Sequence, residues 1–188
     1  MDSVNVAALV LRLAVGGTMM AHGCNHAFGG GRLPGTARWF ESIGIRPGRV
    51  HALFATVTEI AAGLLLVLGL LTPPAAAAVV GTMVVALVAN HARNGFFIFR
   101  PGEGYEYVLM IILVACALGA LGGGAWSVDH AIGLSVRGWS GLALAVAAGG
   151  AGAALLLATC WRPHRPHSAS SVQASNTVDE PARGAATT

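Results

Sequence analysis

Two charged residues lie deep inside apolar stretches of the sequence, Arg12 within residues 4–21 and Glu59 within residues 50–71. A charge at the centre of a bilayer costs at least about 2.5–3.5 kcal/mol on insertion scales, so each side chain needs a partner. With a rise of about 1.5 Å per helical residue, counting from the ends of the stretches places the two charges within about 5 Å of one depth. The pattern predicts an intramembrane ion pair between Arg12 and Glu59. Such a pair serves either as a structural link between two helices or as a polar site for a headgroup or a proton.

A second set of polar residues gathers where apolar stretches begin or end. His22 follows the first stretch, His91 ends the third, and Tyr105 and Glu106 begin the fourth. Because successive spans run in opposite directions, these positions return to one membrane depth. Two imidazoles, a phenol and a carboxyl suit either a headgroup and proton site or an ordinary membrane interface.

Other chemistries have weaker support. His22, Cys24 and His26 lie within about one helical turn, but no standard zinc spacing is present, and no metal site is predicted. The three cysteines, Cys24, Cys116 and Cys160, contain no C-x-x-C pair, which argues against a disulfide-forming mechanism. The sequence has no phosphate loop, nucleophile elbow or dinucleotide fingerprint.

The elements that must position these residues are membrane spans. The chain of 188 residues is 55% hydrophobic and 10% charged, against about 25% charged in ordinary soluble domains. Five stretches approach the roughly 20 apolar residues that a span needs: 4–21, 50–71, 75–91, 105–121 and 139–160. Pro73 and Pro74 end the second span and predict a tight turn into the third. The lipid bilayer is therefore the first partner, and nothing indicates nucleic acid, because no basic run is interleaved with aromatic residues.

Orientation follows from the arginines. The segments 23–49 and 92–104 and the tail after Cys160 hold nine arginines, whereas only Arg137 lies in the loops on the other side. The positive-inside rule predicts a plasma-membrane protein with these segments in the cytoplasm and its N-terminus outside.

Three further segments have local predictions. Residues 33–45, with Trp39 as an anchor, are expected to form either a short interfacial helix or an ordinary loop helix. The tail 162–188 is expected to be disordered. In the last span, a stripe of small residues spaced by four predicts close helix contact, either inside the chain or with a second copy in a homo-oligomer: Gly141, Ala145, Gly149 and Ala153.

The sequence resembles the DoxX family of small membrane proteins. The similarity rests on LRLAVGGTMMAHG at 11–23, FGGG at 28–31 and WFESIGI at 39–45. It continues with TEIAAGLLLVLGLLTP at 58–73, HARNGFF at 91–97 and GYEYVLMIIL at 104–113. Together these motifs cover about residues 9–130. The resemblance places Arg12, His22, Gly23, Glu59, His91, Asn94, Gly95, Tyr105 and Glu106 on family motif positions, which adds Asn94 to the expected site. Where the family usually has a lysine after the His-Gly pair, this chain has Asn25 and His26.

The expected fold class is an all-α integral membrane protein, an antiparallel four-helix DoxX-like bundle with a fifth transmembrane helix. The expected units are a bundle at 1–134, an added span at 135–161 and a tail at 162–188. The resemblance implies a redox-associated membrane subunit that binds quinone or a partner oxidoreductase in thiol or oxidative-stress defence. No haem, flavin or iron–sulfur signature is present, so a redox role requires a quinone or another subunit. The alternatives are a non-catalytic anchor for a soluble enzyme and a small-solute transporter.

Overall fold

The computed structural model describes residues 3–163; the predicted disordered tail lies almost wholly outside this range. Long apolar runs give long helices, connected by two short helices and by loops. In order they are α1 (Ser3–Phe28), α2 (Arg32–Ser42), α3 (Gly48–Leu68), α4 (Thr72–Ala86), the π-helix η1 (Leu87–His91), α5 (Glu106–Leu121), α6 (Val128–Ala131) and α7 (Gly138–Cys160).

Within residues 3–163, four helical stretches are long and apolar enough to cross a membrane: α1, α3, α7 and α4 continued through η1. The fifth long helix, α5, has 16 residues and is apolar along its length. At 1.5 Å per residue it is about 24 Å long, a few ångströms short of a typical hydrocarbon core. The all-α membrane fold predicted from the sequence is confirmed, with α5 shorter than its four neighbours.

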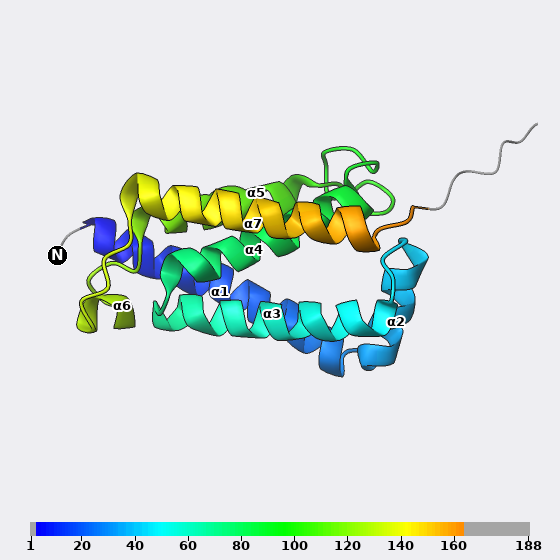
Figure 1. The fold of residues 1–188 in the computed structure, drawn as a ribbon, viewed down its shortest axis with the longest axis horizontal. Helices are drawn as coiled ribbons and strands as arrows, with labels where there is room; N and C mark the ends of the chain where they lie inside the picture. Colours follow the sequence, from blue (N-terminus) through cyan, green and yellow to red (C-terminus); the bar gives the residue numbers. More distant parts are fainter. Residues whose placement is uncertain (1–2, 164–188) are drawn as a thin grey trace, which may run out of the picture.

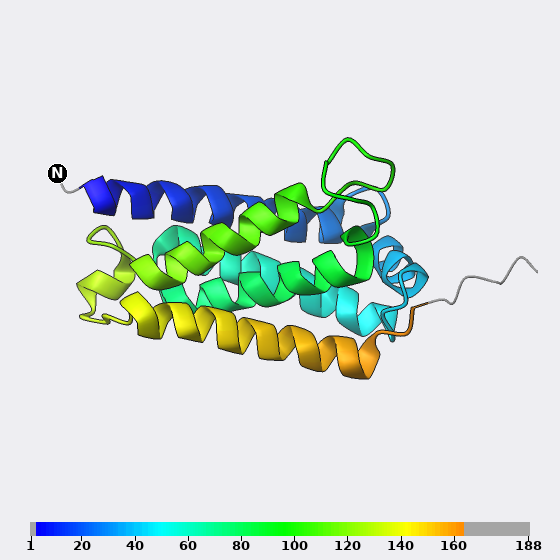
Figure 2. The same ribbon diagram turned by 90° about the horizontal axis from the view of Figure 1, so that it is seen from above.

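The five long helices lie side by side along one axis (Figures 1 and 2). The N-terminus of α1 and the short helix α6 lie at one end of the bundle, which we call the α6 end. Helix α2, the segment 92–105 and the last turn of α7 lie at the opposite end, the α2 end (Figure 1). Helix α1 therefore begins at the α6 end and α7 finishes at the α2 end, as expected for an odd number of long helices.

The turn between α3 and α4 is built from residues with unusual backbone conformations. Gly69 ends α3 with φ +65°, and Leu71 follows with φ +51°. Asp129, from α6, stabilises the start of α4: its carboxylate accepts hydrogen bonds from the backbone N–H of Leu71 (2.7 Å) and of Thr72 (2.9 Å) and from the Thr72 hydroxyl (2.7 Å). Proline is suited to the first turn of the next helix, because no partner exists there for its missing N–H. The tight turn predicted from Pro73 and Pro74 is present.

Helices α1 and α3 contact each other through glycines. A Cβ atom on Gly16 would lie 2.7 Å from the carbonyl oxygen of Gly63, and a Cβ on Gly63 would lie 2.6 Å from that of Gly16. Further along, a Cβ on Gly23 would lie 3.0 Å from the carbonyl oxygen of Thr56. These contacts bring the two backbones together and fix the register of the pair.

The small-residue stripe of α7 packs inside the chain. Gly141, Ala145, Gly149 and Ala153 are the buried residues of that helix. A Cβ on Gly141 would lie 2.1 Å from the Gly119 carbonyl of α5, and one on Gly149 would lie 2.6 Å from the Ala77 carbonyl of α4. The intramolecular alternative is therefore the one observed, and the stripe offers no free surface for a second copy.

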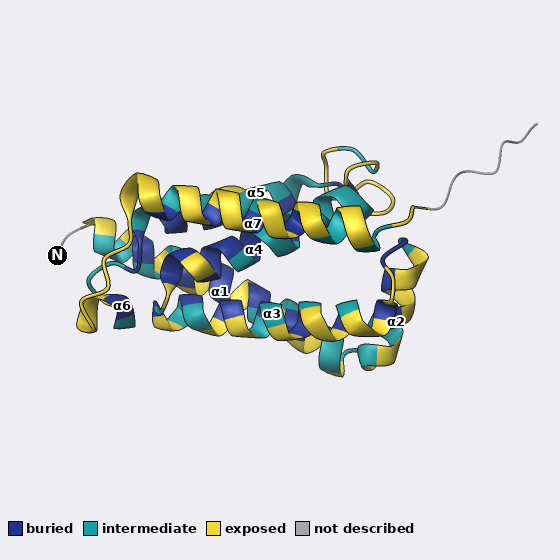
Figure 3. Ribbon diagram, in the orientation of Figure 1, coloured by how far each residue is buried: buried dark blue, intermediate teal, exposed yellow. Residues whose placement is uncertain are grey.

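The remaining burial pattern is that of a bundle with an apolar exterior. Met19, Leu66, Val79 and Leu118 pack together in the interior, from four different helices. The outward faces of α3 and α7 are mostly exposed (Figure 3) and carry large apolar side chains, such as Phe54 and Leu155. In a membrane, lipid covers these faces.

Candidate functional site

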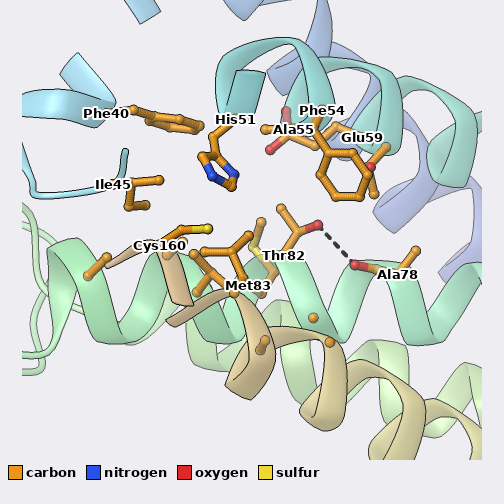
Figure 4. Close-up of a pocket in the computed structure, with 18 of the residues that line it drawn as sticks. Phe40, Ile45, His51, Phe54, Ala55, Glu59, Ala78, Thr82, Met83 and Cys160 are labelled. Atoms are coloured by element: carbon orange, nitrogen blue, oxygen red, sulfur yellow. Dashed lines mark hydrogen bonds between the residues drawn. The ribbon is translucent and has the colours of Figure 1, made fainter. Parts of the chain in front are cut away.

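A cavity of about 700 Å³ lies near the α2 end of the bundle, between α3, α4 and α7. His51, Phe54 and Glu59 of α3 face Thr82 and Met83 of α4 across it (Figure 4). Phe40 and Ile45 lie at its α2 side, and Cys160 enters from the end of α7 (Figure 4).

The cavity exists because its floor is made of small side chains. Helix α4 and η1 contribute Ala77, Ala78, Gly81, Ala86 and Ala89 to the lining. Small side chains leave volume between helices that larger residues would fill. From α7, Gly149, Gly152 and Ala153 continue the same pattern.

A short strap closes the α2 end of the cavity. Ile45 forms an isolated antiparallel bridge with Trp161, in which Arg46 N–H donates to the Cys160 carbonyl (2.9 Å) and Arg162 N–H donates to the Gly44 carbonyl (2.7 Å). The Trp161 indole N–H donates to the Ile43 carbonyl (3.0 Å). These bonds connect the end of α7 to the α2–α3 turn, so the strap holds one wall of the cavity in place.

Polar and aromatic groups gather on the otherwise apolar lining. Those that carry titratable side chains are His22, His26, His51, Glu59, His91, Tyr107 and Cys160. They come from five different helices. His22, His91 and Glu59 were predicted from the sequence as polar-site residues, and the cavity brings these three to one place.

Glu59 is, with His91, the most deeply buried of these groups. It is 4% exposed, and its Oε2 atom has no hydrogen-bond partner among the described residues. Nδ1 of His26 lies 3.4 Å from Oε2 but without the geometry of a hydrogen bond. The His51 Nδ1 atom is likewise buried and without a hydrogen-bond partner. The cavity therefore contains unfilled hydrogen-bonding capacity, the property of a site that awaits a polar ligand group.

His91 lies on the π-helix that ends the third long stretch. Its Nδ1 is 3.0 Å from the Glu103 carbonyl oxygen, and its Nε2 is 2.9 Å from the Tyr107 hydroxyl. The rings of His91 and Tyr107 meet edge to face with centroids 5.2 Å apart. π-Helical turns recur at functional sites, because the extra residue rotates the side chains that follow.

The other predicted site residues lie beside the cavity rather than on it. Asn94 donates to the carbonyl oxygens of Gly102 (2.5 Å) and Glu103 (3.0 Å), which orders the segment that holds His91. Glu106 accepts a hydrogen bond from the Ile98 backbone N–H (3.3 Å). The Tyr105 ring packs edge to face on Phe96 with centroids 5.5 Å apart.

The predicted ion pair between Arg12 and Glu59 is wrong. Arg12 is 1% exposed and lies toward the α6 end, where its Nη2 donates to the Trp126 carbonyl oxygen (2.6 Å). Its Nη1 atom lies directly against Gly69, at the opposite end of α3 from His51. Within residues 3–163, the only ion-pair contact of Glu59 is with His26.

The error comes from the helix ends. Helix α1 continues to Phe28, seven residues beyond the apolar stretch used to estimate depth. With Gly16 opposite Gly63, Met20 is level with Glu59, and Arg12 lies eight residues further along α1. At 1.5 Å per residue this separates the two charges by about 12 Å along the bundle.

Sequence reasoning missed four titratable residues of the lining: His26, His51, Tyr107 and Cys160, the last of which was considered only for disulfide chemistry. His26 was considered only for metal binding, and His51 and Tyr107 were not singled out. Tyr107 is a helical residue of α5, whereas Tyr105 precedes that helix and faces the loop. Which residues of α5 face His91 depends on the residue at which that helix begins. Tyr107 could have been predicted only with that starting residue known.

Comparisons with known proteins give one match. A family model described as DoxX matches residues 7–92, from α1 through η1. The motif at 104–113 lies outside the matched range. No match was found among curated proteins or among solved structures.

Proposed function

Because residues 7–92 belong to the DoxX family of membrane proteins, we propose that this chain binds the headgroup of a membrane quinone in the cavity between α3, α4 and α7. In this proposal the protein is the membrane subunit of a quinone-linked oxidoreductase. The observation that carries it is a largely apolar cavity lined by a few polar groups: Glu59, His26, His91 and Tyr107.

The size and lining of the cavity support a small-molecule site. Ligand pockets are typically about 300–1,000 Å³, mostly apolar, with a few polar groups that orient the ligand. A volume of about 700 Å³ accommodates a substituted ring and the first part of its tail. Phe40, Phe54 and Trp39 supply aromatic surface for ring packing.

The cavity opens at the surface between α3 and α7, which supports a ligand that arrives from the lipid. Val50, Phe54 and Leu155 line it and are 59%, 63% and 67% exposed. An isoprenoid tail leaving through this gap would remain in hydrocarbon, while the headgroup reaches His26 and Glu59. A water-soluble substrate gains nothing from such an opening.

A quinone-linked reaction also needs an electron donor, and the α2 end offers a surface for one. Arg32, Arg38, Arg46, Arg49, Arg93, Arg100 and Arg162 are exposed in its connecting segments. By the positive-inside rule this end faces the cytoplasm of the plasma membrane, with the N-terminus of α1 outside. The same surface favours a second candidate function, a non-catalytic anchor that recruits a soluble acidic enzyme.

The native cysteines provide a test of quinone binding. Cys160 lines the cavity, and Cys24 is exposed on α1 away from it. The purified protein is treated with N-ethylmaleimide in detergent while a decyl-substituted benzoquinone is titrated, and both cysteines are followed by mass spectrometry. Quinone binding in the cavity slows modification of Cys160 saturably and leaves Cys24 unchanged.

Two substitutions separate this proposal from the anchor. His91→Ala should weaken protection of Cys160, whereas Glu106→Gln, outside the cavity, should not. Equal modification of Cys160 at every quinone concentration in folded protein would remove the quinone proposal and leave the anchor. Accessibility of cysteines introduced at Arg38 and Arg137 in intact cells tests the orientation independently.

A further inference from the structure

The hydrogen-bond direction at His91 is fixed by its neighbours. A carbonyl oxygen only accepts hydrogen bonds, so Nδ1, 3.0 Å from the Glu103 carbonyl, must carry the hydrogen. In the neutral imidazole Nε2 is then an acceptor. The Asn90 amide nitrogen, a donor, lies 3.2 Å from Nε2, which fits the same assignment.

The Tyr107 hydroxyl is therefore oriented. Its oxygen is 2.9 Å from Nε2 of His91, and this contact is favourable only when the hydroxyl donates its hydrogen to Nε2. The Tyr107 oxygen then presents lone pairs alone to the cavity. The Thr82 oxygen likewise has only lone pairs to offer a ligand, because its hydroxyl donates its hydrogen to the Ala78 carbonyl (2.9 Å, Figure 4).

Glu59 adds a further acceptor on the lining. Its carboxyl group is buried, and none of the described residues donates to Oε2. A carboxylate accepts hydrogen bonds only, and a protonated carboxyl still keeps acceptor capacity. Tyr107 and Glu59 both line the cavity, so both acceptors face a ligand bound there.

The lining also carries donors: the Trp39 indole N–H, and the hydroxyl of Thr58, which donates or accepts. The Thr159 hydroxyl donates to the Leu155 carbonyl (2.7 Å), so its hydrogen is also used. His51 has an unpartnered Nδ1 that accepts in one tautomer and donates in the other. The imidazoles adapt to a ligand, and so does Glu59, because a protonated carboxyl also donates. The oxygens of Tyr107 and Thr82, whose hydrogens are already used, require a ligand that donates.

We infer that the cavity selects a headgroup that donates hydrogen bonds and discriminates against one that only accepts them. This rests on the proposed quinone site and makes it specific: the preferred form is the hydroquinone, whose two hydroxyls lie on opposite sides of the ring. The quinone form, with two carbonyl oxygens, has no hydrogen to offer to the oxygens of Tyr107 and Thr82.

Three ligands of nearly one shape test the selection. An alkyl hydroquinone, its dimethyl ether and the corresponding quinone are compared by protection of Cys160 from N-ethylmaleimide, under nitrogen. One net hydrogen bond is worth roughly 0.5–1.5 kcal/mol, so we expect the hydroquinone to bind about 2- to 10-fold more tightly than either donor-free ligand. A monoacylglycerol, which carries hydroxyl donors on a lipid, is a fourth arm. Protection by it as well would support donor selection and extend the source to lipid hydroxyls.

Matched variants show which residues cause the preference for a ligand that donates hydrogen bonds. Tyr107→Phe removes the oriented acceptor and should lower the hydroquinone-to-ether ratio toward one, while Tyr105→Phe, two residues away and off the cavity, should leave it unchanged. Glu59→Gln tests the contribution of the buried carboxyl group to the selection, with Glu106→Gln as its control. Equal affinity for the three ring ligands overturns the inference but leaves the quinone site standing, whereas no protection by any of them overturns both.

Discussion

Arg12 lies against the α-carbon of Gly69, so close that a Cβ atom at position 69 would be 1.5 Å from the Nη1 atom of Arg12. The guanidinium cannot move freely, because Nη2 donates to the Trp126 carbonyl and the side chain is 1% exposed. Gly69 itself has φ +65°, in the left-handed region. Its carbonyl accepts from the Asp129 N–H (2.9 Å), so the same residue also connects α3 to α6.

Gly69→Ala should destabilise the bundle. The left-handed conformation costs a non-glycine residue about 1–2 kcal/mol, and displacement of Arg12 adds the loss of its bond to Trp126. We expect a lower midpoint of thermal unfolding in detergent. The control is Gly17→Ala, at a helical position with nothing within 4 Å of the added atom, which should keep or slightly raise the midpoint. Equal midpoints for the two variants would contradict this account of the Arg12 contact.

Arg12 and Glu59 should behave as independent residues. They contact different partners at different depths, and mutations at sites without shared partners usually add within about 0.3–0.5 kcal/mol. The measurement is a double-mutant cycle of Arg12→Gln and Glu59→Gln on unfolding in detergent. A coupling energy above about 1 kcal/mol would restore the ion pair that the sequence suggested.

The spans and their packing were accessible from the sequence, but the site was not. Hydrophobic length located all five long helices, and the four-residue spacing identified the face of α7 that packs against α4 and α5. The partners of Arg12 and Glu59 depended on register, which the contact of Gly16 with Gly63 sets. Tyr107 depended on where α5 begins and on the π-helical turn at His91, and neither has a strong local signal in one sequence.

The wall that α7 contributes to the cavity depends on Gly149. A Cβ there would lie 2.6 Å from the Ala77 carbonyl and 2.9 Å from the Val80 side chain, so Gly149→Leu should force α7 away from α4. Gly150→Leu is the matched control, because nothing lies within 4 Å of its added atom. We expect faster modification of Cys160 by N-ethylmaleimide in Gly149→Leu and an unchanged rate in Gly150→Leu. Equal rates in the two variants would show that the Gly149 contact does not hold the wall.

Asn94 should influence the cavity without touching it. Its amide donates to the carbonyls of Gly102 and Glu103, and the Glu103 carbonyl also accepts the His91 Nδ1 hydrogen that sets the direction of the Tyr107 bond. Asn94→Ala should leave the fold intact and reduce affinity for the hydroquinone by a few-fold, the value of about one hydrogen bond. Affinity for the dimethyl ether should change less, because the ether makes no use of the oriented acceptor. An equal loss for both ligands would mean that Asn94 acts on the shape of the cavity rather than on the orientation of His91 and Tyr107.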